Sequence, residues 1–92
     1  MIERRVTIGS QVGLHARPAS LFVQKVNKLP IEVNIGKAGS EAVSARSIMS
    51  VLALNIAGGE EVVLTTNAAG SDEMMDTLAA FLATDLDAAG HE

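Results

Sequence analysis

Hydrophobic and polar positions alternate with two different periods along this chain, and the change of period marks the first two predicted elements. Residues 2–8 alternate with the two-residue period of a β-strand. Beyond Ala16, apolar side chains recur at the spacing of one helix face: Ala19, Phe22, Val23 and Val26. Pro18 fits the first turn of this helix, where an amide hydrogen has no helical acceptor, and Pro30 ends it.

The middle of the chain predicts a hairpin followed by a short helix. Residues 31–36 alternate as a second strand, and residues 41–45 form a third strand beyond a glycine-bearing turn. Residues 46–57 are typical of a helix, with Ser47 as its candidate cap and the glycine pair at 58–59 as its end.

The last part of the chain predicts one more strand and one more helix. Residues 60–67 form the strand. Ser71 is the candidate cap of the helix, and Asp72 and Glu73 lie in its first turn, where negative charge is favoured. The apolar stripe of this helix comprises Met75, Leu78, Ala79 and Leu82. Residues 83–92 are expected to fray.

The element order β-α-β-β-α-β-α predicts an α+β fold in which three helices must cover one antiparallel sheet, giving a two-layer sandwich. The pattern leaves the order of the strands open. With 92 residues, the chain is expected to form a single domain, 1–92.

Composition removes several classes of function. There is no cysteine, and the two histidines lie far apart, so neither a disulfide nor a metal site is predicted. No nucleotide-binding glycine loop is present, and no cofactor is expected. A net charge of −4, without a basic cluster, argues against nucleic acid as a partner. The charged first residues and the lack of a long apolar stretch predict a cytoplasmic protein that does not insert into a membrane.

His15 is the residue with the most distinctive surroundings. It directly precedes a predicted helix, whose first amide groups lack partners and whose dipole is positive at that end. Such ends bind anions, phosphate above all, and Arg17 adds a donor fork suited to phosphate oxygens. The same positive field is expected to favour the neutral imidazole, which is a nucleophile that can take up a phosphoryl group.

A simpler interpretation of His15 is an exposed loop residue beside a surface arginine, and local features alone leave the two interpretations equally open. The second histidine, His91, lies in the final residues and is expected to be inert.

The helix predicted at 46–57 is apolar on two faces, although a short helix on a single sheet can bury only one. Ile48, Met49 and Leu52 share one face, whereas Val51 and Leu54 lie nearly opposite. Either one face is an exposed partner surface or another part of the chain covers it. A phosphate on Ser47 would add negative charge beside this surface and repel a partner.

Two motifs, GLHARPAS at 13–20 and RSIMSVLAL at 46–54, resemble those of the histidine-containing phosphocarrier protein HPr of the bacterial phosphoenolpyruvate:sugar phosphotransferase system. The element order, length and glycine turns are also similar, so the resemblance covers nearly the whole chain. It implies an open-faced β-sandwich with a four-stranded antiparallel sheet covered on one side by three helices. The carrier is not an enzyme but a co-substrate in a relay.

The resemblance further implies a role for each site residue. His15 would accept a phosphoryl group on Nδ1 from phosphorylated enzyme I and pass it to sugar-specific enzyme IIA domains. Arg17 and the backbone amides of Ala16 and Arg17 would stabilise the phosphate. Ser47 aligns with a serine that an HPr kinase modifies in some bacteria, and transcriptional regulators are further possible partners. The implied docking surface comprises Ala16, Ser20, Gln24, Asn27, Ile48, Met49 and Leu52.

Two alternatives stay open beside this hypothesis. One is a carrier with the same chemistry in a regulatory, nitrogen-linked branch, and the other is a non-catalytic α+β interaction domain in which His15 is incidental. A monomer is expected, because the one suspected apolar patch is assigned to transient partners. The sequence does not identify the sugars or the acceptors served.

Overall fold

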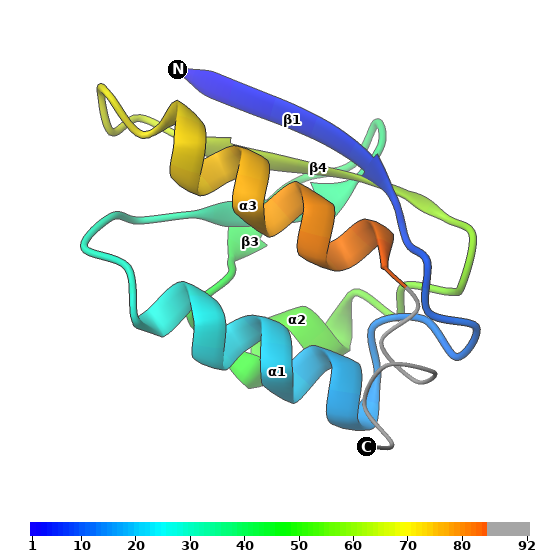
Figure 1. Ribbon diagram of the computed structural model, residues 1–92. Helices are drawn as coiled ribbons and strands as arrows, with labels where there is room; N and C mark the ends of the chain where they lie inside the picture. The colour runs from blue at the N-terminus through cyan, green and yellow to red at the C-terminus, as the bar shows by residue number, and fades with distance from the viewer. Residues whose placement is uncertain (85–92) are drawn as a thin grey trace.

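The computed structural model describes residues 1–84, apart from the Ala16 side chain, and places them in four strands and three helices (Figure 1). Along the chain these are β1 (Ile2–Thr7), α1 (Ala16–Asn27), β2 (Asn34–Lys37), β3 (Val43–Ser44), α2 (Ile48–Ala53), β4 (Glu61–Thr66) and α3 (Asp72–Ala83). The predicted element order is confirmed, and β3 is much shorter than the strand predicted at 41–45.

The sheet is antiparallel throughout and has the order β1-β4-β2-β3, which the sequence pattern had left open. The last strand along the chain is therefore central: β4 pairs along its whole length with β1, from Ile2 opposite Thr66 to Thr7 opposite Glu61, and with β2 on its other side. The helices cover one face of the sheet, as the resemblance implied (Figure 1).

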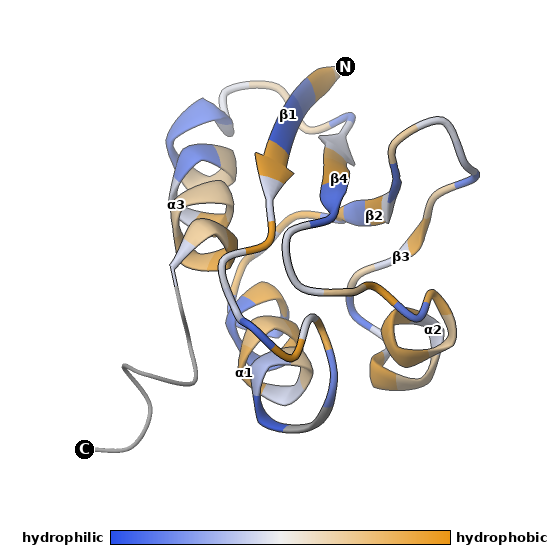
Figure 2. Ribbon diagram, turned by 90° about the vertical axis from the view of Figure 1, so that its right-hand side faces the viewer, coloured by the Kyte–Doolittle hydropathy of each residue, from blue (hydrophilic) through white to orange (hydrophobic). Residues whose placement is uncertain are grey.

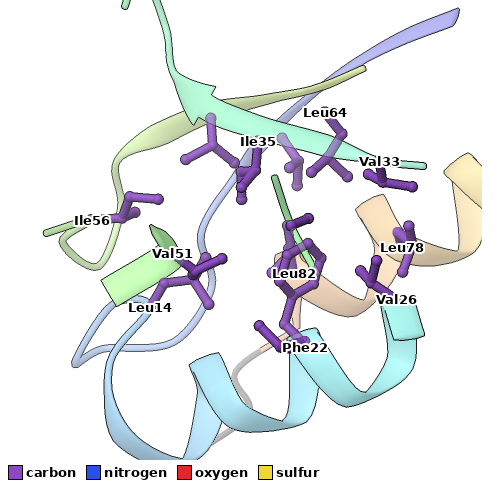
Figure 3. Packing of buried hydrophobic residues seen from close by; sticks show 14 of the residues in the cluster. Leu14, Phe22, Val26, Val33, Ile35, Val51, Ile56, Leu64, Leu78 and Leu82 are labelled. Atoms are coloured by element: carbon purple, nitrogen blue, oxygen red, sulfur yellow. The ribbon is translucent and has the colours of Figure 1, made fainter. Parts of the chain in front are cut away.

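The core lies between the sheet and the helices and is almost entirely aliphatic. The alternation of β4 turns Val62 and Leu64 inward, where both are fully buried. From the opposite layer, Phe22 of α1 points toward the sheet, with Leu82 of α3 beside it (Figure 3). The predicted stripe of α1 is confirmed, because Ala19, Phe22, Val23 and Val26 are all buried.

The predicted end of the second helix was wrong. α2 ends at Ala53 rather than at the glycine pair 58–59, and Asn55 adopts a left-handed conformation with φ 54°. Asparagine tolerates this conformation better than most residues. The turn leads the chain back to the core, where Ile56 is fully buried, and a continued helix could not bury that side chain in the same way.

The predicted cap of the third helix is also corrected. Ser71 occupies the N-cap position of α3, but its side chain makes no capping hydrogen bond; its hydroxyl donates to the Ala68 carbonyl at 2.6 Å instead. The hydroxyl is therefore bonded within the turn that precedes the helix and does not cap it. Asp72 and Glu73 do lie in the first turn, as predicted, and the stripe holds, since Met75, Leu78 and Leu82 are buried.

Ala83 and Thr84 are the first two residues of the segment predicted to fray. Ala83 is the last residue of α3, and the Thr84 amide donates to the Phe81 carbonyl at 3.2 Å. The remainder of that segment, including His91, lies outside the described residues. No helix within residues 1–84 is long and apolar enough to cross a membrane.

Candidate phosphate site at the start of α1

The loop between β1 and α1 is fixed by a close backbone approach to the loop between α2 and β4. Gly13 has φ 79°, and a Cβ there would lie 2.1 Å from the Ile56 carbonyl oxygen, so no side chain fits. The next amide, of Leu14, donates to that same oxygen at 3.0 Å. Leu14 is itself only 1% exposed. The residue that follows Leu14 is therefore presented from a rigid support.

That residue, His15, is the N-cap of α1. Its backbone is extended, with φ −130° and ψ 163°, and its carbonyl accepts the Ala19 amide at 3.4 Å. Its side chain makes no capping hydrogen bond, unlike that of a serine or aspartate cap. The half-buried imidazole is thus held at the helix entrance without taking the role of a cap.

The first turn of α1, next to His15, has backbone amides that are free to bind a ligand. The amides of Ala16 and Arg17 have no acceptor within the helix, and Pro18 has no amide hydrogen at all. The Arg17 side chain is exposed, and the first turn holds no acidic residue. His15 thus stands at the positive end of the helix dipole, with the exposed Arg17 two positions later in the same turn, and the phosphate-binding role of this group stays a prediction.

A small ion-pair cluster holds the supporting loop from the other side. The Ala57 amide donates to the Glu60 carboxylate at 2.9 Å, and the Lys37 ammonium lies 3.3 Å from that carboxylate. The hydrogen bond from Ala57, followed by the contact with Lys37, lowers the pKa of Glu60. The loop that receives Leu14 is thus itself pinned to the end of β2.

The predicted docking stripe of α1 lies along the outside of the helix. Gln24 and Asn27 are exposed and Ser20 is half-buried, so the stripe avoids the core face. The Gln24 side chain donates to the Ser20 hydroxyl at 3.1 Å within the helix. Asn27, in contrast, bonds to Arg46, just before α2.

The ambiguity of the second helix is resolved by its packing. Val51 is fully buried, whereas Met49 is 74% exposed. Ile48, Leu52 and Leu54 pack against the core but remain partly exposed. Figure 2 shows α2 as a largely hydrophobic ribbon at one edge of the molecule. The face that holds Met49 is thus the outward one, and Ser47 caps the helix as predicted, its hydroxyl accepting the Ser50 amide at 3.2 Å.

Two residues escaped the sequence analysis. Val12 is 53% exposed in the loop before α1, three positions before His15, so it adds an exposed apolar side chain to that loop. The sequence signal that could have identified it is an apolar residue in a predicted glycine-containing loop, where a side chain is often exposed. The second is Arg46, the first residue of the motif at 46–54, which was given no role of its own because its contacts with Asn27 depend on tertiary structure.

The start of α1 is suited to an anion, because its first amides lack helical acceptors and its dipole is positive there. Within residues 1–84, no three carboxylate or imidazole side chains are grouped as metal ligands would be. The two pockets described at the surface are lined by other residues, between β2 and the end of β4 and between α1 and α3. Neither pocket includes His15 or Arg17; the imidazole is half-buried and the Arg17 side chain is exposed.

Sequence and structure comparisons with known proteins point to one family. The family model described as "PTS HPr component phosphorylation site" matches residues 2–84. The phosphocarrier protein HPr of Streptomyces coelicolor is 44% identical, over 95% of this chain and 94% of its own length. The HPr-like protein Crh of Halalkalibacterium halodurans is 40% identical, over 89% of this chain and 96% of its own. The crystal structure of a phosphocarrier protein HPr from Bacillus anthracis superimposes with a TM-score of 0.80 at 37% identity, covering 88% of this chain and 95% of that one.

Proposed function

Because the chain belongs to the HPr family of phosphocarriers of the phosphotransferase system, we propose that His15 accepts a phosphoryl group from phosphorylated enzyme I and passes it to enzyme IIA domains. The observation that carries this proposal is the position of His15 at the start of α1, with an imidazole that does not cap the helix. The protein then acts as a co-substrate of its partners and not as an enzyme.

In the proposed step, the Nδ1 lone pair of neutral His15 attacks the phosphorus held on the donor imidazole of enzyme I. The new N–P bond forms as the donor N–P bond breaks, and the donor nitrogen keeps the electron pair. The amides of Ala16 and Arg17 and the Arg17 guanidinium stabilise the phosphoryl oxygens during transfer. Both N–P bonds are of the same kind, so the step is readily reversible and the next acceptor can take the group.

Docking is proposed to use the outer stripe of α1 and the outward face of α2. Met49 supplies the most exposed apolar side chain of this surface, and Arg17 supplies charge near the reacting nitrogen. A small, partly apolar contact of this type is suited to a transient complex, which a shuttle between partners requires. We treat the working carrier as a monomer, because self-association through this surface would compete with its partners.

Labelling with enzyme I and labelled phosphoenolpyruvate tests the proposal. The wild-type chain should acquire an acid-labile, base-stable label, and His15→Ala should acquire none. His91→Ala is the matched control, because it removes the other histidine of the chain and should leave the label unchanged. A wild-type chain without label, or a label that survives His15→Ala, would refute the proposal.

The acceptor is identified by a second stage of the same assay. The labelled carrier is mixed with a sugar-specific IIA domain or with a nitrogen-linked IIA protein. We expect rapid transfer to the sugar-specific domain, and preferential transfer to the nitrogen-linked protein would assign the chain to the other branch.

Ser47 is proposed as a regulatory phosphorylation site for an HPr kinase. Its hydroxyl caps α2 and stands two residues before exposed Met49, so a phosphate of about −2 charge would lie at the edge of the docking surface. This part of the proposal is tested through Ser47→Asp below.

A further inference from the structure

Arg46 lies between β3 and α2 and reaches across to the segment that follows α1. Its Nη2 donates to the carbonyls of Leu29 and Ile31, at 2.7 and 2.8 Å. The side chain is only 29% exposed, and its Nε lies 3.5 Å from the Glu32 carboxylate. One guanidinium thus binds several points of the α1–β2 connection at once, which the planar fork of arginine allows and a lysine ammonium does not.

Arg46 and Asn27 also bond to each other in both directions. The Arg46 Nη1 donates to the Asn27 Oδ1 at 3.1 Å, and the Asn27 Nδ2 donates to the Arg46 carbonyl at 3.2 Å. Both polar atoms of the Asn27 side chain are therefore engaged within the protein, although the residue is exposed. The last residue of α1 is tied to the residue just before the cap of α2.

This tie is important because α2 is short. A helix of six residues contains few hydrogen bonds of its own, so its anchors fix its direction. Val51 anchors its inner face in the core, and Ser47 caps its start. Arg46 is the point at which this start is fixed relative to α1. The position of outward Met49 relative to the stripe on α1 depends on it.

We propose that Arg46 is a positioning residue for partner docking: through Asn27 and the carbonyls beyond α1, it holds α2 and α1 in the relative placement that partners recognise. The inference rests on the proposed function. It changes the role that the resemblance implied for Asn27, which then acts by holding Arg46 and not by contacting the partner.

The consequence is confined to docking. His15 lies at the opposite end of α1, about 18 Å from Asn27 for a helix of 12 residues. Loosening the Asn27 end costs preorganisation of the surface and leaves the phosphate site intact. KM for the carrier in the enzyme I reaction should therefore rise, with kcat nearly unchanged.

A double-mutant cycle tests this directly. Asn27→Ala, Arg46→Lys and the double variant are assayed as substrates of enzyme I, and each single change should raise KM about fivefold, which is within the range of coupled networks. The double variant should raise KM no further than the larger single change. Gln24→Ala is the matched control, because Gln24 shares the stripe but bonds only to Ser20; its effect should multiply with that of Arg46→Lys. Multiplying effects for Asn27→Ala and Arg46→Lys would overturn the proposal.

Arg46→Lys also separates geometry from charge. If Arg46 acted by attracting an acidic partner, lysine would keep the wild-type KM while Arg46→Met raised it, and that result would overturn the proposal. The melting temperature of each variant is measured alongside. If Arg46→Met fails to fold, Asn27→Ala still tests the proposal, because Asn27 is exposed and its substitution should leave the fold intact.

A measurement without any partner distinguishes this inference from the proposed function. In the free carrier, Asn27→Ala should shift the amide NMR resonances of Ile48 and Met49, whereas Gln24→Ala should not. Unmoved resonances would refute the positioning role even if phosphotransfer is normal. If the wild-type chain takes no label from enzyme I, the proposed function fails, and shifted resonances would still establish the link between the helices.

Discussion

The N-termini of α1 and α3 have the same backbone dipole, yet the side chains around them carry opposite charge. The first turn of α3 holds Asp72 and Glu73, which neutralise the positive end of its dipole. Arg4 of β1 then pairs with Asp72 at 3.2 Å and with Asp76 at 2.6 Å, which raises the pKa of Arg4, chiefly through Asp76. The charge of this helix end is satisfied within the molecule.

The start of α1 has none of these features. No acidic residue lies in its first turn, and the charged residue of that turn is the positive Arg17. Leaving a helix end uncompensated forgoes stabilisation of about 0.3–1 kcal/mol, which α3 does obtain. A helix dipole alone therefore does not distinguish the two ends; the side chains around α3 neutralise its start within the molecule, whereas the start of α1 is left suited to an anion.

The sharpest way to remove the difference is to give α1 the charge that α3 carries. Arg17→Asp places a carboxylate where the phosphoryl oxygens are proposed to lie, and we expect phosphorylation by enzyme I to slow about 100-fold or more. Arg17→Ala, which only removes the donor, should slow it about tenfold. Rates are measured with labelled phosphoenolpyruvate, and melting temperatures should stay within a few degrees. Unchanged rates in both variants would refute the role of Arg17.

The start of α2 offers an intermediate case, since Ser47 caps the helix beside the proposed docking surface. Aspartate caps helices as well as serine does, so Ser47→Asp should change the free energy of unfolding by less than about 0.5 kcal/mol. Its charge should nevertheless weaken enzyme I binding several-fold. Ser47→Asn is the neutral capping control. A large loss of stability with normal binding would leave Ser47 a structural role only.

The smallest effect is expected where α3 is made more like α1. Asp72→Asn removes one first-turn charge and one partner of Arg4, and should lower stability by about 0.5 kcal/mol, as helix-dipole interactions do. Phosphorylation by enzyme I should not change, because this helix start faces β1 and not the proposed docking surface. A reduced rate of transfer would show that the two helix ends are not functionally separate.

Much of the fold followed from periodicity. The stripes of α1 and α3 and the alternation of β4 were correct because each reflects local geometry against a single core. The strand order was open because pairing partners depend on which segments meet in space. The end of α2 was misplaced because glycine at 58–59 gave a stronger stop signal than Asn55, whose turn is required by the burial of Ile56.

In the candidate site, too, local features could be predicted from the sequence and tertiary contacts could not. His15 and Arg17 could be proposed from the sequence because they are neighbours at a helix start that the pattern predicts, and the structure places that start at Ala16. Arg46 could not be found in this way. Its acceptors lie 15 to 19 residues earlier, and only the folded chain brings them to the guanidinium. The capping bond predicted for Ser71 was wrong for a related reason, since its hydroxyl bonds to a backbone carbonyl of the preceding turn instead.

Pro18 limits the number of backbone donors at the proposed phosphate site. The first turn of α1 can offer two amides, because proline stands at the position of the third. A phosphoryl group has three terminal oxygens, so the third must find its donor on a side chain, and the exposed Arg17 is the one nearby. A site with three fixed amide donors would bind the phosphoryl group more rigidly. A site whose third donor is the long side chain of Arg17 can release the group by moving that side chain at each transfer.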